Sequence, residues 1–547
     1  MDILPAFLKG VREHVVAGDG ETLSQWLLAE PDSPPVYFAL GQELRRRYPK
    51  AGSALRTLIE KSLPEDDEPP ESGNTPWGGF HAFVHEFLVY WRDVNFGDLM
   101  DVHERLLALS TACVSALKHP GQGSLMVQTS VSYAQSMVKL VAVLKSRPDL
   151  TTAAGGKSAG DEEEVRTFVD DVFDLINGIF NNCALDRAPL QPGNKKSVVY
   201  LVGAMAFRLL LVTGKPLTAW TLITGAERAP ALSLFPAAQR VTWLYYLGVV
   251  MFQNDHYPRA VSALSSAYRQ LPPSLTKQRR LVLTHLIPAN ILSGRLPSAE
   301  LLARPEARQL APVFRPLVAA IRKGNFVAFQ HAIAARQDWL LERGLLFPLM
   351  YRARPLLWRS LTRRVFVLTY VPDADTGGSS RKAVTLDINA VHVAATYQQR
   401  LLEGYVPAAP HRGSGSSHFG GGGANPLLMR ALANNTPQPP PGTTLVPGPG
   451  AGAGGRRWRL RAHEGLLWGN LPAAYEHVEE AVMGLVAQGL VNGYVSHSAR
   501  KLAIQGARAA GDAGPALAGW PANVADIIAA RIEESGVDTE WVPGWVK

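Results

Sequence analysis

The stretch GLVNGYVSHSARKLAIQG, residues 489–506, decides the fold expected for the C-terminal part of the chain. Gly489 can end a helix in the left-handed conformation that glycine adopts without steric strain. The residues after it alternate through 494–496, turn near 498–499 and return through 502–504, which predicts a β-hairpin. A helix that runs into a basic hairpin is the outline of a winged helix. The question is whether this wing binds nucleic acid, protein or both.

Three helical segments upstream of the hairpin complete this domain. Residues 355–371 have the spacing of one amphipathic helix, and residues 382–402 predict a short strand, an Asp387 cap and a second helix. A third helix is predicted over 470–489, where apolar residues recur at intervals of three and four. The sequence therefore predicts a winged helix over residues 351–506.

A break in composition interrupts this domain between its second and third helices. Residues 404–455 are rich in Gly, Pro, Ser and Asn, and such a stretch cannot bury enough apolar area to fold. We therefore expect a disordered insertion there. Beyond the hairpin, residues 507–547 form a C-terminal extension, within which a helix is predicted over 523–534.

The middle of the chain carries the residue spacing of a tetratricopeptide repeat. Within residues 241–273, the positions that fit are Gly248, Ala260, Ala267 and Pro272. In such repeats small residues let two antiparallel helices approach closely, and proline closes the unit. Helix-sized apolar segments flank this unit, so we predict a solenoid of helical hairpins over 186–350.

Helical spacing also fills most of residues 1–185, which we interpret as N-terminal helical repeats. Two loops interrupt them, an acidic and Pro/Gly-rich one at 64–76 and a second one at 151–163. The predicted fold class is mostly α, with a tetratricopeptide-like solenoid followed by a C-terminal winged helix.

Composition bounds the class of protein. The 547 residues are 46% hydrophobic, and 55 Lys and Arg against 47 Asp and Glu give a net charge of +8, which suits an anionic partner. Cys113 and Cys183 are the only cysteines, which excludes a disulfide scaffold and fits a reducing compartment. The N-terminus lacks the pattern of a signal peptide. The apolar stretch 197–212 contains Arg208 and is shorter than the roughly 18 to 20 residues of a membrane span, so we expect a soluble chain.

Catalytic and metal-binding motifs are missing from the sequence. His81 and His85 lie one helical turn apart, but no third or fourth metal ligand accompanies them, and ordinary structural histidines are the better interpretation. The acidic segment 372–378 lacks the further ligands of a calcium loop. Neither a phosphate-binding loop nor a nucleophile elbow is present. We predict no enzyme, no cofactor and no metal.

Basic side chains gather in three places in the predicted winged helix. The candidate nucleic-acid-binding residues are Arg359, Arg363 and Arg364 in its first helix, Arg456, Arg457, Trp458, Arg459 and Arg461 in the segment RRWRLR, and Arg500 and Lys501 on the wing. Arg binds phosphate bidentately, and Trp stacks on unpaired bases. RRWRLR can instead be a solvated basic hinge. Arg363 and Arg364 lie about 100° apart on a helix, so at least one can pair with a carboxylate inside the domain.

Base-specific recognition is not expected from the third helix. Residues 473–489 contain Glu476, Glu479 and Glu480 but neither Lys nor Arg, which suits protein packing better than a major groove. The basic cluster at 277–280 is more typical of a solvent-facing helix start or a contact to an acidic partner. We expect backbone-dominated binding with a steep salt dependence.

Three separated blocks, 277–302, 321–345 and 489–502, resemble the PCI domain-containing protein 2 family. The fungal members of this family are the Thp-type partners in the transcription-export complex 2 (TREX-2), and they are also called signalosome-subunit-12-like. The resemblance covers about residues 190–402 and 464–506. It identifies the solenoid and the winged helix together as a PCI domain. The long insertion before the third helix departs from the family and is a hint of a filamentous-fungal source.

The resemblance implies a non-enzymatic adaptor of the nucleus and the nuclear pore. Family members pair with a Sac-type scaffold that has its own PCI domain, and they bind a small acidic Sem/Dss-type protein. Two winged helices then form a platform for mRNA, and possibly DNA, in mRNA export and transcription-coupled processes. The alternative is a structural PCI subunit of a proteasome-lid or signalosome-type complex without nucleic-acid binding.

The wing is expected to contact protein first. We predict that Tyr494, Val495, Leu502 and Ile504 pack the domain and its PCI neighbour, while the two cations of the wing face a phosphate backbone. We expect partners to cover the apolar end of the solenoid and the exposed edge of the winged helix. Co-expression with those partners should therefore raise the solubility of the chain.

Overall fold

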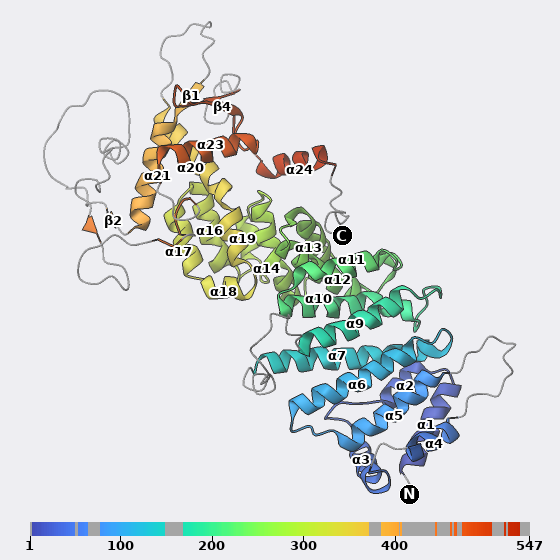
Figure 1. Cartoon of the computed structure of the whole chain (residues 1–547). Coiled ribbons are helices and arrows are strands. Elements are labelled where there is room, and N and C mark those ends of the chain that lie inside the picture. Colours follow the sequence, from blue (N-terminus) through green and yellow to red (C-terminus); the bar gives the residue numbers. More distant parts are fainter. Residues whose placement is uncertain are drawn as a thin grey trace, which may run out of the picture. The chain divides into compact units, whose positions relative to one another are not determined.

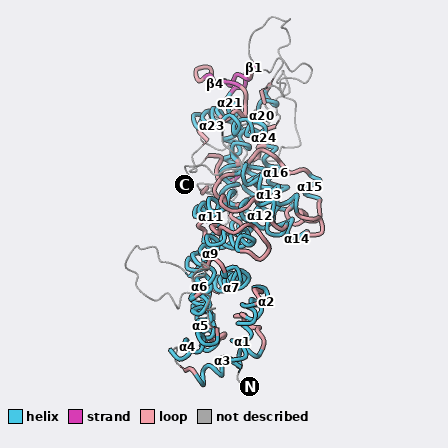
Figure 2. Tube along the Cα trace, turned by 90° about the vertical axis from the view of Figure 1, so that its right-hand side faces the viewer, coloured by secondary structure: helices cyan, strands magenta, loops and turns pink. Residues whose placement is uncertain are grey.

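The computed structural model describes residues 3–49, 53–63, 77–147, 168–370, 384–403, 405–406, 444–445, 460–461, 464–467, 473–505, 519–520 and 523–536. The chain divides into two compact units, one within residues 1–250 and the other within residues 251–541. Helices make up most of both units, as predicted (Figures 1 and 2). The division along the chain falls within helix α12 (Ala237–Gln253), whereas the sequence analysis placed boundaries at 185/186 and 350/351. No change in composition marks this point, because stacked helices contact mainly their neighbours.

The first unit is a stack of helices. They are α1 (Ile3–Val16), α2 (Gly20–Trp26), α3 (Pro35–Arg47), α4 (Ser53–Ser62), α5 (Gly78–Asp93), α6 (Leu99–Leu117), α7 (Val127–Lys145), α9 (Phe168–Ala184), α10 (Val199–Thr213), α11 (Ala219–Ala226) and most of α12. Asp19 and Asp98 cap α2 and α6 by accepting backbone N–H groups with their carboxylates. Helix α5 packs against α3, α4 and α6, and its apolar side is fully buried.

Three aromatic side chains hold the loop that follows α2. The hydroxyls of Tyr90 and Tyr133 donate to the carbonyls of Ala29 and Leu27, at 2.7 and 2.8 Å, and the Trp91 indole donates to the carbonyl of Leu28 at 3.0 Å. Each donor is a polar group at the end of a buried ring, so the loop's carbonyls satisfy it without exposing the ring.

Among the residues that the structure describes, one helical segment has the length and composition of a membrane span. It comprises Lys195–Thr213, which is longer than the apolar stretch counted from the sequence. Most of it is buried within the first unit, where α10 packs against α7, α9 and α11. Length and apolar composition are equally those of a core helix, and this burial favours that role.

The second unit begins with short helices stacked as hairpins. They are α13 (Tyr257–Gln270), α14 (Thr276–Leu292), α15 (Ala299–Ala303), α16 (Ala311–Lys323), α17 (Phe326–Ala334), α18 (Gln337–Glu342) and α19 (Leu346–Arg352). Ala260 and Ala267, two small residues of the predicted repeat, are fully buried on α13. In the 277–280 cluster, Arg279 pairs with Glu306 at 3.1 Å and lies over the ring of Tyr268. Arg279 of that cluster therefore stabilises the solenoid.

A winged helix follows the solenoid in the same unit. It consists of α20 (Arg354–Thr369), β1 (Val384–Asp387), α21 (Ile388–Leu402), α23 (Tyr475–Ala487), β4 (Gly493–Ser496) and β5 (Lys501–Ile504). The sheet has the order β1-β5-β4 with antiparallel pairing, and β1 is the third strand that anchors the wing. Asp387 caps α21, and Gly489 follows α23 with a φ of 74°, both as predicted.

Most of the predicted insertion at 404–455 lies outside the described residues. Two short segments within it are described, β2 (Tyr405–Val406) and β3 (Thr444–Leu445), and they pair antiparallel. The prediction of an insertion without structure is therefore wrong at these two points. Backbone pairing needs only N–H and C=O groups, which a stretch poor in apolar side chains still supplies.

The C-terminal extension contains the predicted helix, α24 (Val524–Glu534), which Asn523 caps. Trp520 is buried and its ring lies 6.2 Å from that of Phe366 on α20. Arg531 donates from α24 to the carbonyl of Ala487 at the end of α23, at 2.9 Å. The described residues of the extension, 519–520 and 523–536, therefore pack onto the winged helix.

Candidate nucleic-acid interface

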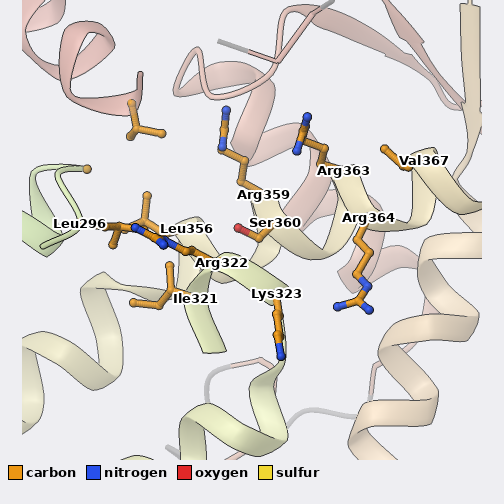
Figure 3. A pocket seen from close by; sticks show the side chains of 12 residues that line it. Leu296, Ile321, Arg322, Lys323, Leu356, Arg359, Ser360, Arg363, Arg364 and Val367 are labelled. Carbon is orange, nitrogen blue, oxygen red and sulfur yellow. The ribbon is translucent and has the colours of Figure 1, made fainter. Parts of the chain in front are cut away.

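A basic pocket of about 350 Å³ lies where α16, α20 and α24 meet in the second unit (Figure 3). The residues of α20 that line it are Leu356, Arg359, Ser360, Arg363, Arg364 and Val367. Their spacings of three and one place them along one side of a helix. The first basic cluster predicted from the sequence therefore lies along one stretch of α20, and both Arg363 and Arg364 line the pocket.

Two further cations come from the end of α16. Arg322 and Lys323 are exposed, and they stand in the last turn, where a positive charge is favourable beside the helix carbonyls. In Figure 3, Arg359 and Arg363 extend side by side from α20, whereas Arg364 and Lys323 extend toward the other side of the view. None of the described residues that line the pocket carries a carboxylate.

A close contact at Gly324 places the end of α16 against α20. Gly324 has a φ of 61°, and a Cβ atom there would lie 2.2 Å from the backbone nitrogen of Leu361. Gln398 of α21 then fixes the turn, since it donates to the carbonyl of Gly324 at 3.0 Å and accepts the N–H of Phe326 at 2.7 Å. The backbone under the cations is thus held by both α20 and α21.

Arg359 is the cation most strongly held by the protein. Its Nε donates to the carbonyl of Leu490, just before the wing, at 3.1 Å. Burial lowers the pKa of its guanidinium, and the neighbouring charge of Arg363 lowers it further. A partly desolvated cation beside a second one favours an anion in the pocket.

The wing contributes its cations at a different place. Arg500 has a φ of 54° and lies over the ring of Tyr475 on α23, 4.9 Å from its centre. Lys501 is exposed and opposes Ser496 in the hairpin. Neither wing cation is among the residues that line the basic pocket.

The segment RRWRLR falls mostly outside the described residues, which include its Leu460 and Arg461 but not Arg456, Arg457, Trp458 or Arg459. Arg461 is exposed, its backbone N–H donates to Glu464 at 2.7 Å, and its guanidinium lies 3.9 Å from that carboxylate. The role of this segment in nucleic-acid binding stays a prediction.

The four wing residues predicted to meet a partner have different exposures. Leu502 and Ile504 are completely buried, so they form the core of the winged helix itself. This corrects their assignment to a partner surface, because a side chain inside its own domain cannot also contact a neighbour. Tyr494 is exposed and Val495 is half-buried, so both stay candidates for a protein contact.

The third helix presents an acidic and apolar face. Glu476, Glu480 and Met483 are exposed on α23, whereas Glu479 is buried and accepts from the ring Nδ1 of His497 at 2.8 Å. Such a face repels phosphate, so α23 does not suit the major groove of a duplex.

Metal-binding clusters are missing from the described residues, where no three His, Cys, Asp or Glu side chains come together. His81 bonds through its Nε2 to the carbonyl of Leu63 at 2.7 Å, which gives it a structural role. Burial raises the pKa of both Cys113 and Cys183 to about 12, so neither thiol is activated.

Sequence comparisons place these features in a known context. No family model matches the chain. It is similar to a protein named CSN12 homolog from Neurospora crassa, at 32% identity over 40% of this chain and 49% of that protein. A Schizosaccharomyces pombe protein of the same name is 28% identical over 45% of this chain and 59% of its own length. PCI domain-containing protein 2 homolog from Drosophila melanogaster is 28% identical over 44% of this chain and 61% of its own.

The chain is therefore similar to PCI-domain proteins of the PCI domain-containing protein 2 type. It spans about half to three fifths of the length of the relatives it matches. The helical solenoid and the winged helix of the second unit are consistent with this similarity, and the basic pocket lies in that unit.

Proposed function

We propose that this PCI-domain protein is a non-enzymatic subunit of a TREX-2-type complex in the nucleus, associated with the nuclear pore. It pairs with a Sac-type scaffold and a small acidic Sem/Dss-type protein, and the assembly binds mRNA, and possibly DNA, during export and transcription-coupled processes. The observation that carries the nucleic-acid role is the basic stripe of α20, which lines a pocket where none of the described residues carries a carboxylate. The relatives' names support the PCI assignment.

The winged helix has one surface suited to protein and another suited to nucleic acid, which supports a role as an adaptor between them. The acidic face of α23 and the exposed Tyr494 suit protein partners, while the basic pocket suits a phosphate backbone. Non-specific backbone binding is expected, since α23, the third helix of the winged helix, carries neither Lys nor Arg for a major groove.

A second candidate is a structural subunit of a signalosome or proteasome-lid type of complex without nucleic-acid binding. The name CSN12 homolog, given to two of the relatives, favours it. PCI domains pair through protein surfaces in either case, so partner identity and nucleic-acid binding separate the two proposals.

Affinity purification from native cells tests the assignment. The tagged full chain is isolated, and its partners are identified by mass spectrometry. We expect a Sac-type PCI scaffold, a small acidic protein and nuclear-pore proteins. Recovery of proteasome-lid or signalosome subunits in their place overturns the proposal.

A gel-shift titration of the purified subcomplex tests the nucleic-acid role. We expect a shift at low salt that weakens when Arg363 and Arg364 are both changed to Glu. Changing the four arginines of RRWRLR to Glu tests that segment separately. A complex that gives no shift at low salt refutes nucleic-acid binding while leaving the PCI assignment intact.

A further inference from the structure

The basic pocket has an apolar wall as well as cations. The wall consists of Leu296, Ile321, Leu356, Val367 and Val524. Val524 belongs to the C-terminal extension and packs directly on Gly294, where a Cβ atom would lie 2.6 Å from its Cγ1. A surface that only followed a phosphate backbone would not need such a wall, because the backbone offers charge and little apolar area.

Three of the cations carry charge that the described residues do not neutralise. Arg322, Lys323 and Arg364 are exposed, and none forms an ion pair with a carboxylate in the described parts of the chain. Guanidinium groups form bidentate hydrogen bonds with phosphate oxygens, and the ammonium group of Lys adds a compact positive charge on a flexible side chain. The positive charge of these three side chains therefore lies at a pocket that aliphatic side chains also line.

We propose that the basic pocket holds one nucleotide of a single-stranded nucleic acid, with its phosphate among the cations and its base or sugar against the apolar wall. This inference rests on the nucleic-acid binding proposed above and specifies its strand state and its site. Arg322, Lys323 and the apolar wall are added to the residues expected from the sequence.

Single strands fit this surface better than duplexes do. In a duplex the bases are stacked inside, so the apolar wall would face only the charged backbone. An unpaired nucleotide can turn its base outward, and flat guanidinium groups stack on bases as aromatic rings do. A volume of about 350 Å³ is at the lower end for small-ligand sites, which suits one such group.

The pocket is held in shape before any ligand arrives. Gly324 lies against α20, Gln398 bonds to both sides of the turn, and Arg359 is tied to Leu490. Only the outer side chains must be ordered on binding, which limits the entropy lost. Helix α24 completes the wall, so the extension takes part in the site.

An acidic peptide is the competing ligand, because carboxylates also pair with Arg and Lys. Asp and Glu side chains offer no flat apolar group to the wall formed by Leu356, Val367 and Val524. Nucleotides combine a charge and a flat ring in one unit, so the two surfaces of the pocket favour them.

The first test uses charge reversal in the full-length protein. Binding of a labelled single-stranded oligonucleotide and of a duplex of the same sequence is measured by fluorescence anisotropy. The variant Arg322→Glu/Lys323→Glu is compared with Lys277→Glu/Arg308→Glu, whose residues are exposed in the same unit but do not line the pocket. Both variants change the net charge equally, so non-specific losses are matched.

We expect the pocket variant to lose single-strand affinity at least tenfold, against threefold or less for the control. If both variants lose the same affinity, the pocket inference fails while nucleic-acid binding stands. If the wild-type chain binds neither oligonucleotide at low salt, both proposals fail. Should the reversal prevent folding, as judged by circular dichroism, Arg322→Gln/Lys323→Gln replaces it with the same expected direction.

The second test addresses the apolar wall. Val367 and Leu368 are neighbours on α20 and are similarly exposed, at 48% and 45%, but only Val367 lines the pocket. We expect Val367→Ser to reduce the preference for single strand over duplex, and Leu368→Ser to leave it unchanged. If both variants show the same preference for single strand over duplex, or if the wild type shows none, the proposed binding of a base or sugar at the apolar wall is wrong.

Competition experiments with the bound oligonucleotide show which chemical group the pocket recognises. We expect a mononucleotide to displace the oligonucleotide at lower concentration than pyrophosphate does. Equal competition by pyrophosphate overturns the role of the base or sugar. Stronger competition by an acidic peptide overturns the choice of nucleic acid and assigns the pocket to a protein ligand.

Discussion

Gly324 stands at a position with two independent requirements that only glycine satisfies. Its φ of 61° is strained for L-residues, and a Cβ atom would collide with the backbone of Leu361. We predict that Gly324→Ala lowers the free energy of unfolding of the second unit by at least about 2 kcal/mol, as strain and a backbone clash combine. Urea unfolding followed by tryptophan fluorescence measures the change.

Gly484 provides the matched control for this substitution. It lies within α23, and no atom is within 4 Å of the position that a Cβ would take. Gly484→Ala should therefore stabilise the helix by roughly 0.5 to 1 kcal/mol. A Gly324→Ala protein as stable as the wild type would show that α16 and α20 can move apart at no cost.

His285 makes stability depend on pH. Its ring is buried on α14 and bonds through Nε2 to the carbonyl of Arg343 at 3.2 Å. Burial lowers its pKa to about 4 from an ordinary value of 6.5. Between these values the unfolded chain binds a proton that the folded chain does not, so stability is complete above pH 6.5 and falls as the pH drops toward 4. At about 1.4 kcal/mol per unit, the loss is on the order of 3 kcal/mol.

The variant His285→Gln isolates this contribution, because glutamine keeps a donor but does not titrate. Other histidines with lowered pKa values, such as His103 and His392, contribute with the same sign in both proteins. The difference in unfolding free energy between wild type and variant, measured in urea from pH 7.5 to 4.5, should shrink or reverse as the pH falls. A constant difference would contradict a depressed pKa at His285.

Individual elements differ in how far the sequence determines them. The helices and strands of the winged helix follow from apolar spacing, the Asp387 cap and Gly489. The basic pocket could be predicted only in part, because Arg322 and Lys323 are about forty residues from Arg363 and reach it through a glycine contact. The sequence RKG at residues 322–324 is recognisable as the end of a helix. It does not indicate that this end packs against α20. The pattern of apolar residues in β5 likewise predicts that one side of the strand is covered. It does not distinguish between cover by the domain's own core and cover by a partner protein.

The C-terminal extension behaves as one element of the winged helix. Trp520 packs beside Phe366, and the N–H of Asn492 donates to the carbonyl of Gly519 at 2.8 Å. We predict that Trp520→Ala costs about 3 to 5 kcal/mol of packing and frees the extension. Hydrogen exchange of the α24 amides should then accelerate at least a hundredfold, while amides of α13 keep their rate.

Ala530→Ser is the control for this loss of packing, since Ala530 is exposed on α24. It should leave the exchange rates within about threefold of wild type, because surface changes in a helix alter stability little. Slow exchange in α24 of the Trp520→Ala protein would mean that Arg531 and the other contacts suffice to hold the extension.

At the scale of the whole molecule, net charge says little about where nucleic acid binds. The +8 of the chain is a small excess spread over 547 residues, whereas five cations and no carboxylate line one pocket among the described residues. The acidic face of α23 belongs to the same domain. Binding should therefore respond to local changes far more than to total charge.

The salt dependence of binding tests this localisation in the full-length protein. For single strands each neutralised phosphate contributes roughly −0.7 to the slope of log K against log salt concentration. We predict that Arg322→Glu/Lys323→Glu makes the slope less steep by about 0.7 to 1.4, equivalent to one or two lost phosphate contacts. Lys277→Glu/Arg308→Glu should shift affinity slightly and keep the slope.

Combining the pocket variant with the arginine-to-Glu variant of RRWRLR shows whether two places on the chain hold separate phosphates. Independent contacts give changes in slope that add, because distant sites contribute separately. A combined slope no shallower than that of either variant alone would mean that both act on one contact. An unchanged slope in the pocket variant would place the released counterions elsewhere on the protein.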